Sequence, residues 1–271
     1  MKLNRIKAIV LHRFYLIRGN PSRFVSIFAW PLVDIILWGF ITRYLNRITS
    51  SGFNFVLTLL GAVLLWDFFT RVMQGITVAF FEDIWARNFL NLFSTPLSLP
   101  EYLVGLLVTG TATSLLGLVV MLGFAFFIFG LSFVSYGWMI FPLIIALFLF
   151  GTALGILSSA VVLKYGPSTE WFIWPIPVLL SPFVGVFYPL SVLPKWMQVI
   201  SLILPPSYVF TDLRAIALGK VYSLTPFFVH LLAAFGIDLI YIAFSCFVFR
   251  WVYQNALKTG IIPRYSAENV T

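Results

Sequence analysis

The sequence predicts an all-α integral membrane protein with six transmembrane helices in one domain over residues 1–271. Apolar residues make up 61% of the chain and charged residues only 10%, whereas a soluble domain has about 25% charged residues. The apolar residues gather in runs of about 20, the length that a helix needs to cross a bilayer. The spans must be helical because lipid offers the backbone no other hydrogen-bond partner. The predicted spans are approximately 24–44, 53–80, 102–130, 136–162, 170–188 and 224–250.

The segment 2–19 predicts an interfacial helix ahead of the first span. Its apolar residues, such as Ile9 and Phe14, are interspersed with basic ones, and Asn20-Pro21 ends the helix. A basic amphipathic helix lies along the inner leaflet. The alternative is a solvated positive segment that only sets topology. No cleavable signal pattern follows it, so we expect no removable leader.

Basic residues near the span ends predict the orientation. With both termini inside, eleven of the 17 Lys and Arg residues fall on inner segments and five on outer ones. Because basic residues favour the cytoplasmic side, we expect a multi-pass protein of the inner (plasma) membrane with both termini and the tail 251–271 in the cytoplasm. The net charge of +8 then sets orientation, and the absence of a folded basic face argues against nucleic-acid binding.

The inner loop between spans two and three predicts an amphipathic cytoplasmic helix over residues 82–95. Acidic residues open the segment and apolar residues recur at helical spacing until Ser94-Thr95-Pro96. Ser98 and Glu101 have the spacing of a capping box, which predicts the start of the third span. The alternative for residues 82–95 is a helix that only connects two spans.

The segment 189–219 is apolar but is divided by prolines into pieces too short to cross a bilayer. It predicts two short helices at the outer membrane edge, the second capped by Ser207 and ended by Gly219. Trp196 suits the headgroup layer. A loose loop is disfavoured because it would expose a large apolar patch.

Charged residues in the spans must face protein or water, because inserting each one at the membrane centre costs at least about 2.5–3.5 kcal/mol of free energy. Asp67 and Arg71 are one helical turn apart and can pair, and Gln74 continues their face. This set is either a structural ion pair or a polar stripe on a transport path. Asp238 has no marked companion, which favours a structural role.

The first span presents Trp30, Asp34 and Trp38 on one face. Aromatic rings stack on sugars and a carboxylate accepts hydrogen bonds from hydroxyls, so this face suits a glycan or an amphiphilic ligand. The alternative is that both tryptophans are interface anchors and that Asp34 is paired or protonated.

Several kinds of site are missing from the sequence. No phosphate-binding loop of the G-x-x-x-x-G-K-[ST] type is present, so the chain is not expected to bind ATP and energy must come from elsewhere. The sequence also offers no cluster of metal ligands and no activated nucleophile. Small residues at Gly110, Thr113, Ser114 and Gly117, and at Gly151 and Gly155, predict close helix packing.

The outer segment resembles the one that precedes the last helix in type-2 ABC exporter permeases. The shared features are Tyr188-Pro189, the leucine-proline-x-tryptophan of 193–196, Pro205-Pro206 and Leu213-Arg214. The interfacial helix and the inner loop, with its threonine-proline-x-serine spelling, resemble the same family. The resemblance extends over nearly the whole chain.

The resemblance implies a homodimeric or pseudodimeric permease that two separate ABC ATPase subunits drive, with ATP and Mg on those subunits and no cofactor in this chain. It implies outward movement of a drug-like, lipid-like or lipid-linked glycan substrate, as in drug and lipid exporters or in O-antigen and teichoic-acid exporters. The alternative function is a proton- or ion-coupled carrier using Asp34, Asp67 and Asp238. A membrane enzyme lacks support.

The candidate residues fall into three groups. The substrate path comprises Trp30, Asp34, Trp38, Asp67, Arg71 and Gln74. The resemblance assigns the coupling helix that docks on the ATPase to residues 82–95, with Glu82, Asp83, Trp85, Arg87, Phe89 and Phe93. The outer gate comprises Tyr188, Pro189, Pro194, Trp196, Pro205, Pro206 and Arg214.

Overall fold

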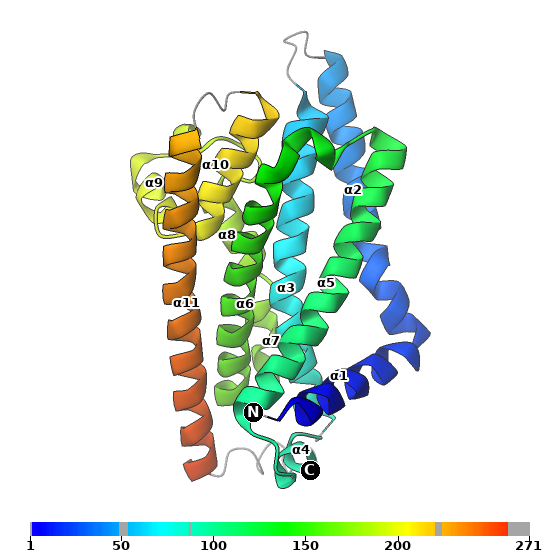
Figure 1. Cartoon of the computed structure of the whole chain (residues 1–271), viewed down its shortest axis with the longest axis vertical. Coiled ribbons are helices and arrows are strands. Elements are labelled where there is room, and N and C mark those ends of the chain that lie inside the picture. Colours follow the sequence, from blue (N-terminus) through cyan, green and yellow to red (C-terminus); the bar gives the residue numbers. More distant parts are fainter. Residues whose placement is uncertain (1, 49–53, 87, 220–223, 260–271) are drawn as a thin grey trace.

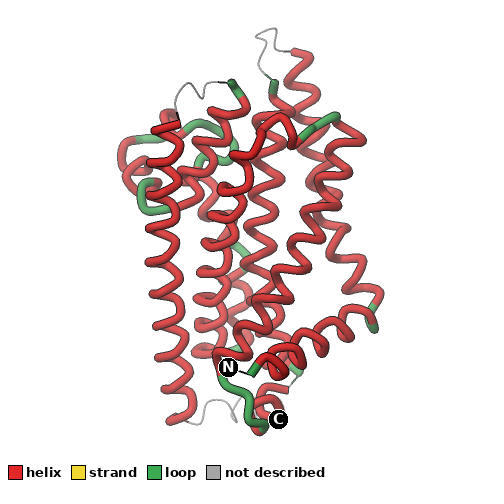
Figure 2. The backbone as a smooth tube through the Cα atoms, in the orientation of Figure 1, coloured by secondary structure: helices red, strands yellow, loops and turns green. Residues whose placement is uncertain are grey.

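The computed structural model describes residues 2–48, 54–86, 88–219 and 224–259, and these residues form helices and no strand (Figures 1 and 2). The longer helices are α1 (Leu3–Arg18), α2 (Pro21–Ile48), α3 (Gly61–Trp85), α5 (Leu99–Phe129), α6 (Ile140–Tyr165), α10 (Pro205–Ala217) and α11 (Leu224–Thr259). The shorter ones are η1 (Val56–Leu60), α4 (Asn88–Ser94), η2 (Phe133–Met139), η3 (Pro167–Thr169), α7 (Glu170–Ile173), α8 (Ile176–Val184), η4 (Leu190–Val192) and α9 (Lys195–Ser201).

Four helices among the described residues are long and apolar enough to cross a membrane. They are Val56–Trp85, Leu99–Phe129, Phe133–Tyr165 and Leu224–Thr259, and they correspond to the predicted second, third, fourth and sixth spans. The predicted first span lies within α2, which is 28 residues long. The chain is therefore a multi-pass membrane protein.

The predicted fifth span, 170–188, differs from the structure. Two short helices, α7 and α8, replace one continuous helix, and Trp174-Pro175 separates them. Pro175 has no N–H to continue the helical hydrogen bonds and its ring blocks the preceding turn. The break leaves a short apolar helical stretch, Trp171–Val184, in place of a full span.

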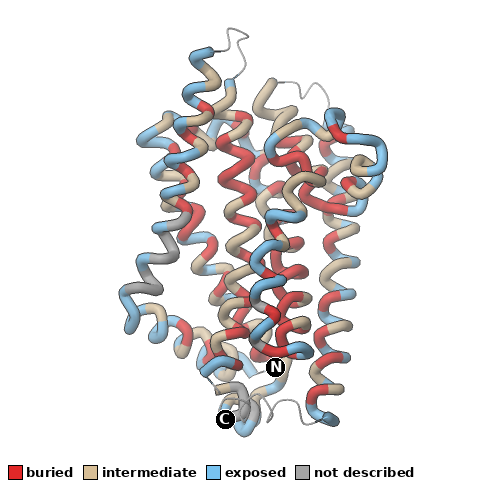
Figure 3. Tube along the Cα trace, turned by 180° about the vertical axis from the view of Figure 1, so that it is seen from behind, coloured by how far each residue is buried: buried red, intermediate tan, exposed pale blue. Residues whose placement is uncertain are grey.

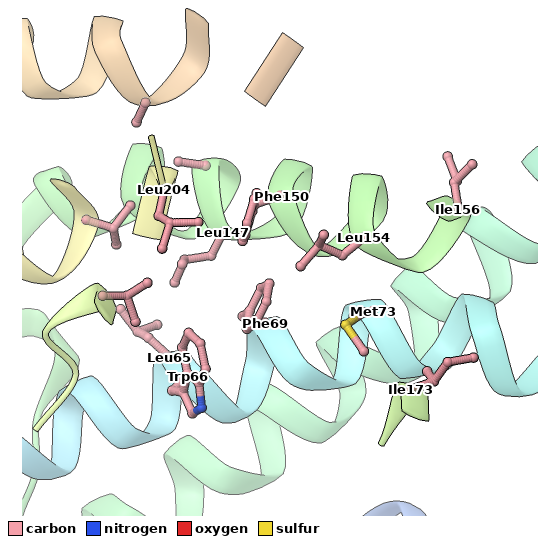
Figure 4. Close-up of a cluster of buried hydrophobic side chains, with 14 of the residues drawn as sticks. Leu65, Trp66, Phe69, Met73, Leu147, Phe150, Leu154, Ile156, Ile173 and Leu204 are labelled. Carbon is pink, nitrogen blue, oxygen red and sulfur yellow. The ribbon is translucent and has the colours of Figure 1, made fainter. Parts of the chain in front are cut away.

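The centre of the bundle is formed by α3 and α6. In their most apolar stretches 67% and 61% of the residues are buried, against 17% in α11, so α11 lies at the periphery (Figure 3). Phe69 of α3 stacks on Phe150 of α6 at 5.5 Å between ring centroids, within a cluster of large apolar side chains (Figure 4).

Glycines allow α3 and α6 to approach closely. A Cβ atom at Gly151 would lie 3.0 Å from the Phe69 carbonyl oxygen, and one at Gly155 would lie 2.9 Å from that of Met73. A larger residue at either position would force the helices apart. The predicted close packing by Gly151 and Gly155 is therefore confirmed.

The two distinctive segments lie at opposite ends of the bundle. Helices α1 and α4 and the last turns of α11 lie at one end, whereas α9 and α10 lie at the other (Figure 1). We call these the α1 end and the α10 end. The predicted helix at 2–19 is confirmed as α1, and α11 continues as a helix past the predicted limit at 250 to Thr259.

Candidate functional site

A buried ionic cluster fixes α1 to α3 at the α1 end. The Arg13 side chain is only 4% exposed, and its guanidinium donates to Glu82 Oε2 at 3.1 Å and also to Asp83 and to the Ala79 carbonyl. The Tyr102 hydroxyl of α5 donates to Asp83 Oδ2 at 2.6 Å. Sequence reasoning missed this cluster, because Arg13 resembles any other basic residue of an amphipathic helix.

Glu101 forms a second anchor between α1 and α5. Its carboxylate accepts hydrogen bonds from the Ser98 N–H at 3.0 Å, from the Lys2 N–H at 2.7 Å and from the Arg5 guanidinium at 3.2 Å. The predicted capping box of Ser98 and Glu101 is confirmed. Ile9 is buried over Gly105, where a Cβ atom would lie 2.6 Å from the isoleucine. Helix α1 is thus bound tightly to the bundle.

The single helix predicted over residues 82–95 is divided in the structure. Helix α3 continues to Trp85, and α4 begins at Asn88. Asp83 is 3% exposed and bonded within the chain, so its carboxylate faces Arg13 and Tyr102 and is not presented on the surface. The structure differs from the prediction because Glu82 and Asp83 pair with Arg13 of α1, which is distant from them in the sequence.

Trp85 is an exposed aromatic residue of this segment. It is 68% exposed and its ring packs against Phe81 at 5.4 Å. Glu82 retains partial exposure, with its side chain 30% exposed. Arg87 and the side chains of Phe89 and Phe93 lie outside the described residues.

The outer segment forms the predicted pair of short helices. Helices α9 and α10 meet at an angle of 100°. Pro189 and Pro194 stand immediately before η4 and α9, and Pro205 and Pro206 occupy the first turn of α10, where a missing N–H costs nothing. Trp196 is 62% exposed and packs edge-on against Phe183.

The ends of α10 correct one prediction and confirm another. Leu204 occupies the N-cap position, and Ser207 lies inside the helix, where its hydroxyl donates to the carbonyls of Ser201 at 2.5 Å and Leu204 at 2.7 Å. The proline pair starts the helix three residues earlier than predicted. Gly219 follows the helix with φ +63°, as predicted for a terminator.

Polar side chains tie α10 to its neighbours. The Arg214 guanidinium donates to the Gly185 carbonyl at 2.9 Å, so it binds the chain after α8. Tyr188 donates to the Pro182 carbonyl at 2.9 Å. Asp212 of α10 is hydrogen-bonded to His230 of α11 at 2.6 Å, a pair that the sequence did not suggest because 18 residues separate them.

The candidate path residues lie on α2 and α3. Asp34 and Asp67 lie close enough to Arg71 to interact electrostatically with its guanidinium. Gly117 of α5 makes room for Arg71, since a Cβ atom there would lie 3.3 Å from its Nη1. Three helices therefore surround this polar cluster.

Arg71 and Gln74 line a cavity of about 180 Å³ between α3 and α5, together with Thr113 and Ser114. Trp38 lies apart from it and stacks on Phe187, with ring centroids 4.9 Å apart. The side chain of Trp30 lies outside the described residues. Of the residues predicted for the substrate path, Arg71 and Gln74 line this cavity, and Asp34 and Asp67 lie near Arg71.

Asp238 is separate from this cluster. It is fully buried in α11, and neither carboxyl oxygen has a hydrogen-bond partner within the described part of the chain. Within that same part, no three His, Cys, Asp or Glu side chains are placed to hold a metal ion.

Comparison with known families decides the identity of this architecture. The model of the ABC-2 type transporter family matches residues 6–218, from within α1 to the end of α10. The chain belongs to the ABC-2 type transporter family. It is thus the membrane-spanning permease part of an ABC transporter, and the family implies an ABC ATPase as its partner. No curated protein was found to match the chain.

The ABC-2 match covers the structural features described above. It includes the Arg13 cluster, the loop with α4, the polar cluster of α2 and α3, and the bent pair α9 and α10, whereas Lys2 and Arg5 of the Glu101 anchor precede it. The last helix, α11, follows the matched region and packs against α6 and α10.

Proposed function

We propose that this ABC-2 permease exports a drug-like, lipid-like or lipid-linked glycan substrate, as a homodimer driven by two ABC ATPase subunits. The α1 end is cytoplasmic in this proposal and α4 with Trp85 meets the ATPase. The α10 end faces outward, and the bent pair α9 and α10 controls the exit. The bundle is set in the inner (plasma) membrane.

The polar cluster of Asp34, Asp67 and Arg71 is the observation that carries the proposal. Asp67 and Arg71 lie within Val56–Trp85, which is long and apolar enough to cross the membrane. Keeping charged residues at that depth costs free energy. The cluster's neighbours Gln74, Thr113 and Ser114 line a cavity, as expected of a polar path through the bundle. A carrier relay through Asp34, Asp67 and Asp238 has less support, because Asp238 lies apart in α11.

The test reconstitutes the permease with its ATPase subunits in vesicles and follows ATP-dependent movement of fluorescent lipids. We expect movement toward the leaflet at the α10 end, and a decrease of tenfold or more in Asp34→Asn at unchanged expression and dimer content. ATP-independent movement driven by a proton gradient would favour the carrier. Loss of folding in Asp34→Asn would return Asp34 to a structural role.

A further inference from the structure

Two adjoining cavities form one groove along α3 and α5. The first, described above, is lined by Arg71, Gln74 and Ser114. The second, also about 180 Å³, is bounded by α1 as well as by α3 and α5. Its lining includes Arg13, Leu16 and Ile17 of α1, Glu82 of α3 and Thr109 of α5. Gly75, Val78 and Thr113 line both cavities, so we treat them as one and call it the α3–α5 groove.

The α3–α5 groove connects the α1 end with the polar cluster. One end lies at Arg13 and Glu82, beside the interfacial helix, and the other lies at Arg71. Between them Gly75 and Gly110 let the helices touch, since a Cβ atom at Gly75 would lie 3.2 Å from the Gly110 Cα atom. The groove therefore runs from the membrane surface toward the bundle centre.

Hydroxyl groups line the α5 wall of the groove. Ser114 is only 2% exposed, and its Oγ has no hydrogen-bond partner among residues 2–48, 54–86, 88–219 and 224–259. A buried hydroxyl without a partner costs free energy, which a bound polar group would recover. Thr109 and Thr113 donate to carbonyls of their own helix, at 2.9 and 3.1 Å, so their hydroxyl oxygens can still accept hydrogen bonds.

The charges at the two ends of the groove disfavour an anion. Arg13 meets Glu82 and Asp83, and Arg71 interacts with Asp34 and Asp67. Each guanidinium therefore already interacts with carboxylates and is not free to bind an anion. An uncharged group that both donates and accepts hydrogen bonds needs no free cation and still satisfies Ser114 and Gln74.

We propose that the α3–α5 groove binds the uncharged, hydroxyl-rich headgroup of a lipid taken from the inner leaflet. Leu16 and Ile17 of α1 form the apolar rim on which the first methylene groups rest, while the acyl chains remain in the bilayer. The proposal rests on the proposed function, since it identifies the polar part of the exported substrate as a glycosyl headgroup.

The experiment measures occupancy of the groove without requiring transport. Thr109→Cys is made in a Cys246→Ser background of the permease–ATPase complex, in vesicles of phosphatidylethanolamine and phosphatidylglycerol. A membrane-impermeant maleimide is added from the α1 side, with and without diacylglycerol glucoside in the vesicles. Val108→Cys is the matched control, because Val108 is 44% exposed and lines neither cavity.

We expect the glucoside to slow labelling of Thr109→Cys at least fivefold and to leave Val108→Cys unchanged. Adding Ser114→Ala should raise the glucoside content needed for this protection. Absence of labelling, or labelling that the glucoside does not slow, would overturn the proposal. Equal protection by additional phosphatidylglycerol would overturn the assignment to an uncharged headgroup.

A second measurement separates this proposal from export itself. Protection of Thr109→Cys without any ATP-driven lipid movement would contradict export and support the groove. Conversely, ATP-driven movement of a fluorescent glucosyl lipid that persists in Thr113→Trp would contradict the groove. Ala112→Trp, on the neighbouring exposed position of α5, is the control for bulk and should transport as the parent does.

Discussion

At the scale of single residues, Arg13 has the most consequential position. One guanidinium joins α1 to the end of α3, and Tyr102 extends the same cluster to α5. Such a buried set is strongly destabilised when one member is removed, because the remaining charges keep their desolvation cost. The attachment of α1 to α3 and α5 at this site thus depends on a small number of side chains.

Replacing Arg13 by Met should therefore destabilise the protein by about 3–5 kcal/mol, the usual effect of breaking a buried ion pair. The measurement is the thermal unfolding temperature of the purified complex. Arg18→Met, at an exposed position of the same helix, is the control and should change stability by less than about 0.5 kcal/mol. Equal effects of the two substitutions would show that the cluster contributes little.

A second residue-scale prediction concerns the contact of α3 with α6. Gly155→Leu should destabilise the protein by about 1–3 kcal/mol, because the new side chain meets the Met73 carbonyl and Ile76. Gly123→Leu should be tolerated, since nothing lies within 4 Å of a Cβ atom at that position. Unfolding temperatures of both variants check this, and a larger loss at Gly123 would contradict the packing argument.

At the scale of elements, the bent pair α9 and α10 is an ordered structure with a buried side. Phe210 and Leu213 are each 1% exposed and pack into the core, whereas Trp196 faces outward. The prolines set where the helices begin, and the contacts of Ser201, Ser207 and Arg214 hold them at the observed angle.

Single cysteines in a Cys246→Ser background test this arrangement. A membrane-impermeant maleimide added from outside should label Val192→Cys, Trp196→Cys and Ile203→Cys, whose parent side chains are 58–69% exposed. Phe210→Cys should react at least tenfold more slowly because that site is buried. Trapping the ATPase with nucleotide should alter the pattern if the pair is a gate. Uniform labelling at all four sites would instead indicate a solvated loop.

The proposed docking of Trp85 on the ATPase yields a separate prediction. Trp85→Ala should abolish most substrate-stimulated ATP hydrolysis of the complex, because exposed aromatic anchors tend to dominate protein interfaces. Trp196→Ala is the control, with a similarly exposed tryptophan at the opposite end. Assembly is checked by co-purification. Hydrolysis that is unchanged in Trp85→Ala would place the docking surface elsewhere.

At the scale of the whole molecule, function is divided between this chain and another. The chain has the membrane helices of an ABC-2 transporter, and its sequence has no phosphate-binding loop. The α1 end carries the loop with α4, and the α10 end carries the bent pair. In the proposed function, a movement that the ATPase imposes at the α1 end opens the α10 end, so transport requires the partner.

Accordingly, the purified chain alone should neither hydrolyse ATP nor bind it tightly. Calorimetric titration with Mg-ATP and a phosphate-release assay check both points. Hydrolysis should begin when the ATPase subunit is added, and a hydrolysis-deficient ATPase is the control for contaminating activity. Micromolar binding of ATP by the isolated chain would contradict the division.

The sequence by itself determined the class of protein and most of its helices. Hydrophobic runs, the Ser98–Glu101 capping pattern and the prolines of 189–219 act over short stretches of chain, so they can be interpreted locally. The fifth span shows the limit of that approach. Pro31 lies inside the continuous helix α2 whereas Pro175 separates α7 from α8, so a proline in an apolar run does not by itself show whether the helix continues. Composition determines whether a segment enters lipid, whereas backbone hydrogen bonding determines whether it forms one helix.

The tertiary structure alone decided which polar residues meet. Arg13 pairs with acidic residues about 70 positions away, and Lys2 donates to Glu101. Ser114, which the sequence assigned to close helix packing, also lines a cavity with Arg71. No local pattern encodes these pairs, because each depends on how helices that are distant in sequence are oriented toward one another. The candidate path residues of α2 and α3 could thus be identified from the sequence. That α5 forms a wall of the cavity, and that the cavity opens beside α1, follow only from the folded structure.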